Sequence, residues 1–325
     1  MTMNILFEDL NALYLGRPVE KESYTLYEYV LDEKNREAQG TRARDVAYFQ
    51  GIMKDFKIRK SILNRRDFSY LDHGEDASLR DRFPRLNLHK VQAFCRDNGV
   101  SENVLFLTAF NYCIGIFSGE KDAISTSIHS GRTDGRWTRL AGPLFLTYLF
   151  RYTVIPHETV RDLLRRAGKQ VMETMRCHTS TIHGDEMFFQ YQGDILNINE
   201  IGGAPAERLK IQLDSLPFHL QVFSDSQGYF YELRYWENRF DREQLAIFMT
   251  CMEVIVEAML DEPSARRLKS HLPERVFPKH YFIKASTVNR TVGFRLIQDM
   301  AGDMDVKAYV LDDACRKQPF GNAHY

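Results

Sequence analysis

The sequence predicts an α/β fold, in which helices pack on a mixed sheet. Segments with apolar residues at three- and four-residue spacing alternate with short segments rich in β-branched and aromatic residues. The 325 residues are 44% hydrophobic and 27% charged, which is typical of a soluble globular protein and long enough for about two domains. The 12% aromatic content is too high for a disordered chain.

The N-terminal part is expected to be helical. Residues 5–15 place apolar side chains such as Leu6 and Leu10 on one face and end at Gly16, which predicts an amphipathic helix. A second helical region covers about 25–54 and is interrupted near Gly40.

The stretch 57–84 is heavily charged with few periodic apolar residues, so it is interpreted as a linker or crossing segment. The resulting domain division is 1–75, 76–262 and a tail, 263–325, with little periodicity.

The middle of the chain carries the clearest signals. Ser101 can cap a buried helix that reaches Phe117, and Asp241 can begin a long helix over 240–260. The turn-rich residues 225–228 predict a hairpin. The other expected elements are helices over 88–97 and 160–175 and strands over 122–129, 144–154, 188–191, 209–213, 218–224 and 229–236, of which 144–154 is apolar enough for a central strand.

Charge and composition exclude several partners. With a net charge of -1, the chain has no global attraction for phosphate backbones or anionic lipid, so no nucleic acid partner is expected. The longest uncharged stretch, 103–119, is too short to span a bilayer, and no secretion signal is visible. The five cysteines form no C-x-x-C pair, so no disulfide framework or zinc site is suggested and a cytoplasmic location is expected.

Common enzyme fingerprints, such as G-x-S-x-G, H-E-x-x-H and the P-loop, are missing from the sequence. His178, His183, Asp185 and Glu186 occur within nine residues, but four polar residues in a surface loop are more often solvated than metal-bound. No metal site is therefore predicted.

Four residues near predicted strand ends are candidates for a site. His129 could act as a base or line a tunnel, or it could be a structural histidine. Arg132 and Arg151 could bind an anion, but an anchoring role in an ion pair or loop is the more common case. Tyr148 could line a pocket, although an aromatic residue in a buried strand belongs to the core by default.

Several segments, in the right order, resemble the condensation domain of nonribosomal peptide synthetases. The resemblance covers residues 3 to about 262. The matching segments are ILFEDLNALYLGR (5–17), SYTLYEYVLDEKNRE (23–37), the helix and strand that lead to Ser-Gly-Arg (101–132), AGPLFLTYLFR (141–151), FFQYQGDI (188–195) and the hairpin with its following helix (218–248).

The resemblance implies a chloramphenicol-acetyltransferase-like two-lobed fold with a truncated first lobe and a second lobe built on a mixed sheet with flanking helices. The family's His-His-x-x-x-Asp-Gly motif does not occur in this chain, so no catalytic residue is assigned. In the Gly-x-Phe-Val-Asn-Thr segment, Gly142, Thr147 and Arg151 match, but Leu146 replaces the asparagine. The implied substrate-channel candidates are His129, Thr147 and Tyr148, with Arg132 and Arg151 as structural anchors.

The implied function is part of a condensation domain, which joins a carrier-bound acyl or peptidyl thioester to an aminoacyl amine. The chain alone is expected to be inactive, and no directly bound cofactor is expected because the substrates are tethered to phosphopantetheine. Carrier-protein domains and adjacent synthetase domains are the implied partners. Two alternatives are a noncatalytic docking module for those domains and a free-standing CoA-dependent acyltransferase, which the missing histidine motif disfavours.

Two further expectations concern the ends of the chain. Without a sheet in the first lobe, the apolar faces of the helices within 5–53 should be exposed to water. Residues 306–325 resemble a segment inside adenylation domains, and sixty residues are too few for a whole adenylation domain.

Overall fold

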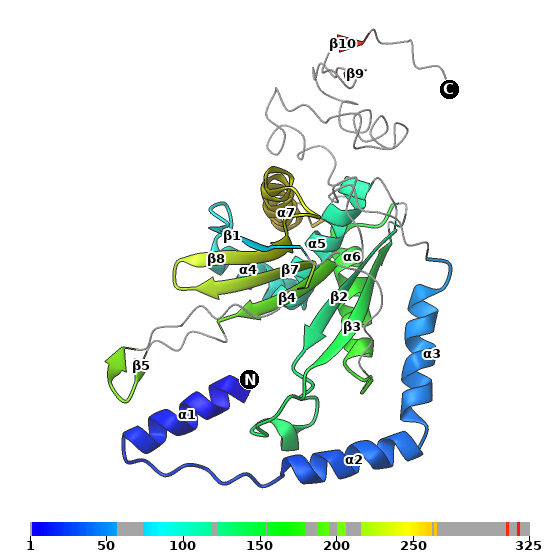
Figure 1. Cartoon of the computed structure of the whole chain (residues 1–325). Helices are drawn as coiled ribbons and strands as arrows, with labels where there is room; N and C mark the ends of the chain where they lie inside the picture. The colour runs from blue at the N-terminus through cyan, green and yellow to red at the C-terminus, as the bar shows by residue number, and fades with distance from the viewer. Residues whose placement is uncertain are drawn as a thin grey trace.

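The fold is taken from a computed structural model (Figure 1). It describes residues 2–56, 74–118, 122–153, 155, 157–179, 187–194, 200–205, 216–261, 263–264, 310–311 and 317–318. The expected strand over 209–213 and most of the tail lie outside the described residues.

Three helices form the N-terminal part. Thr25 begins the second helix with a capping box, in which its hydroxyl accepts from the Glu28 backbone N–H and its own N–H donates to the Glu28 carboxylate. Gly40 has a φ of +82° and separates the second helix from the third, as the sequence predicts. The helices are α1 (Thr2–Tyr14), α2 (Leu26–Ala38) and α3 (Thr41–Met53).

A six-stranded mixed sheet forms the centre of the fold, in the order β1-β8-β7-β4-β2-β3. The strand β4 is parallel to β2 and β7, whereas the other neighbours are antiparallel. The strands are β1 (Asp76–Arg82), β2 (Asp122–His129), β3 (Leu146–Thr153), β4 (Met187–Gly193), β7 (Phe218–Asp225) and β8 (Gly228–Trp236), while β5 (Glu200–Ile201) and β6 (Ala204–Pro205) form a small separate hairpin.

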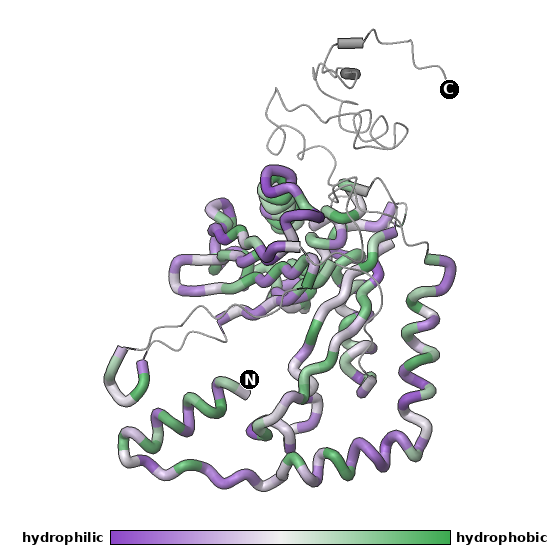
Figure 2. Tube along the Cα trace, in the orientation of Figure 1, coloured by the Kyte–Doolittle hydropathy of each residue, from purple (hydrophilic) through white to green (hydrophobic). Residues whose placement is uncertain are grey.

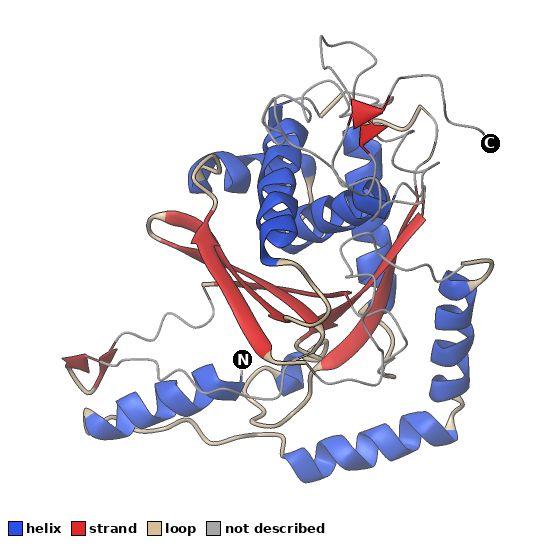
Figure 3. Ribbon diagram, turned by 45° about the horizontal axis from the view of Figure 1, so that its top comes forward, coloured by secondary structure: helices blue, strands red, loops and turns tan. Residues whose placement is uncertain are grey.

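The main core lies between the sheet and two long helices, α5 (Glu102–Ser118) and α7 (Arg242–Asp261). On α5, Phe110 contacts the rings of Phe189, Phe218 and Phe248, which come from β4, β7 and α7. Figure 3 shows the α5 and α7 side of the sheet, with α1 and α2 on the opposite side. The helices α4 (Leu88–Asn98) and α6 (Val160–Thr174) pack beside α5.

Local capping signals in the sequence are confirmed. The Ser101 hydroxyl accepts from the Val104 N–H at 3.2 Å, and the Asp241 carboxylate accepts from the Glu243 and Gln244 N–H groups at 3.0 and 3.1 Å. The loop between β7 and β8 is the expected tight turn, closed by the pair Asp225 and Gly228.

Two strand predictions were wrong. Part of the stretch expected as a linker, 57–84, forms β1, because polar and charged residues alternate with Ala77 and Leu79 along an edge strand that pairs with β8. The segment expected as a central strand contains β3, which pairs with β2 alone among the described strands.

A glutamine side chain covers the outer edge of β3. With its amide oriented to satisfy both partners, Gln170 of α6 accepts from the Arg151 N–H and donates to the Arg151 carbonyl, each at 2.9 Å. These two bonds replace those that a further strand would form. The apolar composition of the segment therefore does not require strands on both sides.

The prediction of exposed apolar faces in the N-terminal helices is confirmed. Apolar positions recur along α1 in Figure 2, and several of them are about half exposed. The exposed large apolar residues of this region are Met3, Leu6, Leu10, Leu13, Tyr14, Leu15, Leu26, Tyr27, Val30, Leu31 and Val46. Within the described part of the chain, no helix combines the length and apolarity needed to cross a membrane.

Candidate functional site

The candidate site is the seam where β2 ends and the chain approaches β3. Gly131 has a φ of +70°, and a Cβ at this position would lie 1.7 Å from the carbonyl oxygen of Leu144. Both the backbone conformation and this close approach require glycine. The turn formed by Ser130, Gly131 and Arg132, here called the seam turn, is thereby fixed against the segment that enters β3.

Arg132 connects the seam turn to two other parts of the chain. Its Nη2 donates to Thr2 Oγ1 and to the Leu140 carbonyl, both at 2.7 Å, and its Nη1 donates to the Ser130 carbonyl at 3.1 Å. The Thr2 hydroxyl donates in turn to the Gly142 carbonyl at 2.6 Å. Burial lowers the pKa of the Arg132 guanidinium. The first turn of α1 therefore reaches the seam through a charge-assisted network.

His129 is neutral and already hydrogen-bonded at one nitrogen. The Gly131 N–H donates to His129 Nδ1 at 3.1 Å, which assigns the proton of the neutral ring to Nε2. Burial, with a smaller contribution from His178, lowers the pKa of His129 to about 4. In this arrangement the Nδ1 lone pair is engaged by the Gly131 N–H and Nε2 carries the proton, so the ring offers no free lone pair to a substrate.

The three substrate-channel candidates lie on two different faces of the sheet. Consecutive residues of a strand point to opposite faces, so Thr147 and Tyr148 are separated by the β3 backbone. Tyr148 is 1% exposed, belongs to the main core and has its ring 5.8 Å from that of His129. Thr147 is half-buried on the face turned away from α5. The three residues therefore do not line one common surface.

Arg151 joins the end of α3 to the edge of the sheet. Its Nη1 donates to the Ile52 and Lys54 carbonyls at 2.9 and 2.7 Å, and its Nη2 lies 3.0 Å from the Asp122 carboxylate. Burial alone would raise the pKa of Asp122, but the hydrogen bonds from Arg151 and Thr153 outweigh it and lower the pKa. Both guanidinium groups singled out in the sequence thus contact backbone carbonyls.

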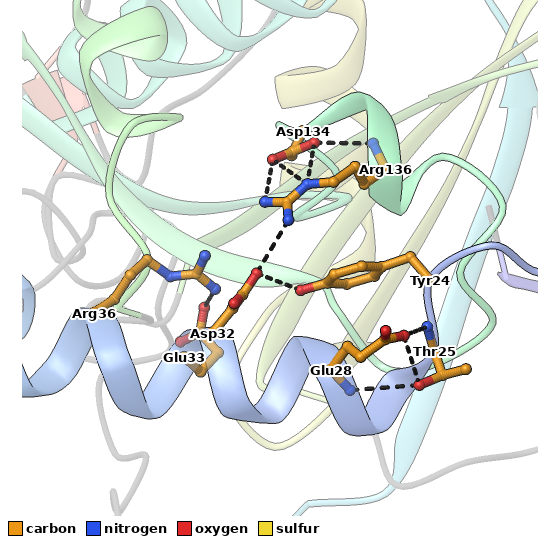
Figure 4. A network of polar contacts seen from close by, with 8 residues as sticks. All are labelled: Tyr24, Thr25, Glu28, Asp32, Glu33, Arg36, Asp134 and Arg136. Atoms are coloured by element: carbon orange, nitrogen blue, oxygen red, sulfur yellow. Dashed lines mark hydrogen bonds and ion pairs between the residues drawn. The ribbon is translucent and has the colours of Figure 1, made fainter.

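The loop after the seam turn rests on helix α2 through a polar network that the sequence did not reveal (Figure 4). Arg136 pairs with Asp134 at 2.8 Å and with Asp32 of α2 at 3.4 Å. The Tyr24 hydroxyl donates to the same Asp32 carboxylate at 2.5 Å, and the Arg136 guanidinium lies 5.0 Å from the Tyr24 ring.

Beside this network, Trp137 is the buried centre of a second, smaller core. It is 2% exposed, and the Arg36 guanidinium lies 5.0 Å from its ring. Tyr29 and His178 contact it edge-on, with centroids 5.2 and 6.0 Å away. Trp137 thus acts as a wedge between the loop and α2. The sequence signal that could have identified it is a tryptophan, one of two in the chain, in a loop otherwise rich in charge and glycine.

The expected absence of a metal centre is tested only in part. His178 packs on Trp137, and its backbone N–H donates to the buried Asp45 carboxylate at 2.7 Å. His183, Asp185 and Glu186 lie outside the described residues. Within the described ranges, no three His, Cys, Asp or Glu side chains are grouped closely enough to hold a metal ion.

The chain matches a known protein family. The profile of the condensation domain family matches residues 1–180, which is more than half of the chain. The chain belongs to the condensation domain family. No curated protein sequence is a significant match.

Solved structures share the fold of this condensation-family chain at low identity. A holo four-domain nonribosomal peptide synthetase bound to AMP and glycine has a TM-score of 0.64 and 12% identity, covering 82% of this chain and 23% of that one. The condensation domain of the monacolin K polyketide synthase MokA has a TM-score of 0.64 and 13% identity, covering 81% and 67%. The X-domain in complex with OxyB from teicoplanin biosynthesis has a TM-score of 0.61 and 15% identity, covering 83% and 66%. The chain therefore has the chloramphenicol-acetyltransferase-like α/β fold but spans about two thirds or less of these chains.

Proposed function

We propose that this chain is the C-terminal portion of a condensation domain of a nonribosomal peptide synthetase and that it requires a first-lobe polypeptide for activity. In the proposed reaction, the amine of a carrier-bound aminoacyl group attacks the carbonyl carbon of a carrier-bound acyl or peptidyl thioester. The new C–N bond forms as the C–S bond breaks, the thiolate leaves on its phosphopantetheine arm, and the amine loses a proton. The proposed partners are carrier and adjacent synthetase domains in the cytoplasm.

The observation that carries this proposal is the exposed apolar surface of α1, together with structural matches that cover more of this chain than of its relatives. Matches cover more than 80% of this chain but about two thirds of the single-domain relatives. Leu6, Leu10 and Leu13 of α1 are 41–64% exposed, although their spacing is typical of a helix with a packed face. A further lobe that covers this face would account for both observations.

The site chemistry supports a need for added catalytic groups. The His-His-x-x-x-Asp-Gly motif is absent from the sequence, and His129 holds a proton at Nε2 while Nδ1 accepts from Gly131. The chain supplies two anchoring residues, Arg132 at the seam and Arg151 at the other end of β3, which we propose hold the second lobe in shape. The proton acceptor for the amine would then come from the first lobe.

The test is reconstitution. The full chain is mixed with a separately expressed first lobe of a condensation domain and with carrier proteins loaded with donor and acceptor substrates, and the peptidyl product is measured by mass spectrometry. Product is expected from the mixture and from neither part alone. The matched control is the same first lobe with its motif histidines changed to alanine, which should bind without restoring product.

Two results would contradict the proposal. Product formation by this chain alone would show that it does not need the missing motif. Sedimentation that detects no association of the chain with any first lobe tested, despite a folded circular dichroism spectrum for both, would exclude a complementary surface on α1.

A second candidate, a noncatalytic docking module, is favoured by one observation. A structural neighbour, the X-domain of teicoplanin biosynthesis, is found in complex with OxyB. If this chain bound carrier or synthetase domains in a pull-down but gave no product with any first lobe, the docking function would replace the catalytic one.

A further inference from the structure

A cluster of uncharged polar side chains lies at the centre of the sheet face turned away from α5 and α7, here called the distal face. Phe189 and Phe218 contact Phe110 of α5, so their neighbours along β4 and β7 point to the distal face. Gln190 of β4 pairs in register with Gln221 of β7. With His219, two positions earlier on β7, these residues form the Gln–His cluster.

The hydrogen bonds inside the Gln–His cluster leave a specific set of groups unused. Gln190 Oε1 accepts from Gln221 Nε2 at 3.1 Å and lies 3.2 Å from His219 Nε2, which must donate because an amide oxygen can only accept. These are the only hydrogen bonds of the three side chains within the described part of the protein. The two Gln190 Nε2 protons are left as donors, and Gln221 Oε1 and His219 Nδ1 are left as acceptors.

The surroundings of these unused groups strengthen the hydrogen bonds that they can form with a ligand. Gln221 is 8% exposed, and the ring of Phe188 contacts the His219 ring edge-on at 4.9 Å. Burial lowers the pKa of His219 to about 4, so the ring is neutral near pH 7. The nearest charges on β8 neutralise each other, since Arg234 and Glu232 are paired at 2.9 Å. Hydrogen bonds are stronger in such a partly dehydrated setting, whose neighbouring charges are paired, than in water.

We propose that the Gln–His cluster binds a secondary amide, with Gln190 Nε2 donating to the amide carbonyl and Gln221 Oε1 or His219 Nδ1 accepting from the amide N–H. A secondary amide offers one donor and one acceptor and no charge, which matches the groups left over. The assignment rests on the proposed function for its biological source, because both a phosphopantetheine arm and a peptidyl backbone contain secondary amides. Thr147 lies on the same face, two strands away from β4.

The test uses side-chain amide resonances of the full-length, isotope-labelled chain. Pantetheine and N-acetylglycine N-methylamide are titrated separately, with cysteamine, which has no amide, as the negative probe. Saturable shifts of the Gln190 and Gln221 side-chain N–H signals are expected with at least one amide probe. Which probe binds more tightly identifies the source of the amide.

The decisive variant is Gln190→Glu, which keeps an oxygen to accept from His219 and Gln221 but removes the two N–H donors. Its apparent affinity for the amide probe is expected to fall at least tenfold. Gln227→Glu makes the same charge change in the exposed turn between β7 and β8 and should bind as the native chain does.

Three outcomes would overturn the inference: no shift with either amide probe, equal shifts with cysteamine, or undiminished binding by a Gln190→Glu variant whose backbone spectrum is native. None of these outcomes depends on the first lobe. Reconstituted activity without amide binding would refute this inference alone, and amide binding without reconstitution would refute the proposed function alone.

Discussion

Replacing Arg132 by alanine removes the guanidinium that joins the seam turn to α1. In the native chain it donates to Thr2 Oγ1 and the Leu140 carbonyl at 2.7 Å and to the Ser130 carbonyl at 3.1 Å. Hydrogen bonds from a charged group contribute about 1.5–3 kcal/mol each, but water can reach a half-buried site and replace part of them. The free energy of unfolding should therefore fall by about 1–3 kcal/mol in total.

The assay is urea unfolding followed by far-ultraviolet circular dichroism, with the slope compared between variants so that a shift in midpoint reports stability. Arg132→Lys keeps the charge but loses the planar fork, and it should recover only part of the loss. Arg96→Ala removes an exposed arginine of α4 that pairs with its neighbour Asp97, and it is the matched control. A midpoint for Arg132→Ala equal to that of the native chain would refute the anchoring argument.

Three further predictions concern the same region. Gly131→Ala should lower the free energy of unfolding by about 1–3 kcal/mol, because Gly131 has a positive φ and a close contact with the Leu144 backbone. Gly135→Ala, with open space around the position, should leave the free energy of unfolding unchanged. An equal effect of the two substitutions would contradict the requirement for glycine in the seam turn. Trp137→Phe should lower the free energy of unfolding, measured in thermal or urea unfolding, by about 1–3 kcal/mol because packing is lost. An unchanged melting curve would show that Trp137 does not hold the loop. The pKa of His129 is lowered to about 4, below the value of about 6.5 in the unfolded chain, so the unfolded state binds more protons between these pH values. The free energy of unfolding is therefore greatest above pH 6.5 and falls as the pH falls toward 4. His129→Asn should reduce this loss of stability at acid pH by up to roughly 3 kcal/mol, while a change at exposed His89 should leave the loss intact.

The tertiary positions of several side chains could not be read from the sequence. The many charged residues of β1 favour a linker, yet edge strands carry such charges, and within β1 Ala77 and Leu79 pack inward. Asp32 and Arg136, which form an ion pair between α2 and the loop after the seam turn, are 104 positions apart, and no local pattern connects them. Their association depends on the path of α2 past the loop.

The sequence by itself determined the elements whose signals are local. The buried helix α5 begins after its Ser101 cap, the tight turn at 225–228 joins β7 to β8, and Asp241 caps α7, because capping and turn formation involve residues only two to four positions apart. The order of the matching segments was enough to identify the condensation family.

Only the tertiary structure decided which side chains meet. The two-residue period of a strand already separates Thr147 from Tyr148, but only the pairing of β4 with β7 in this register brings Gln190 to Gln221. Register is set by hydrogen bonds between strands that are distant in sequence. For that reason the residues that meet at the seam and on the distal face depend on pairing across the sheet and not on spacing along the chain.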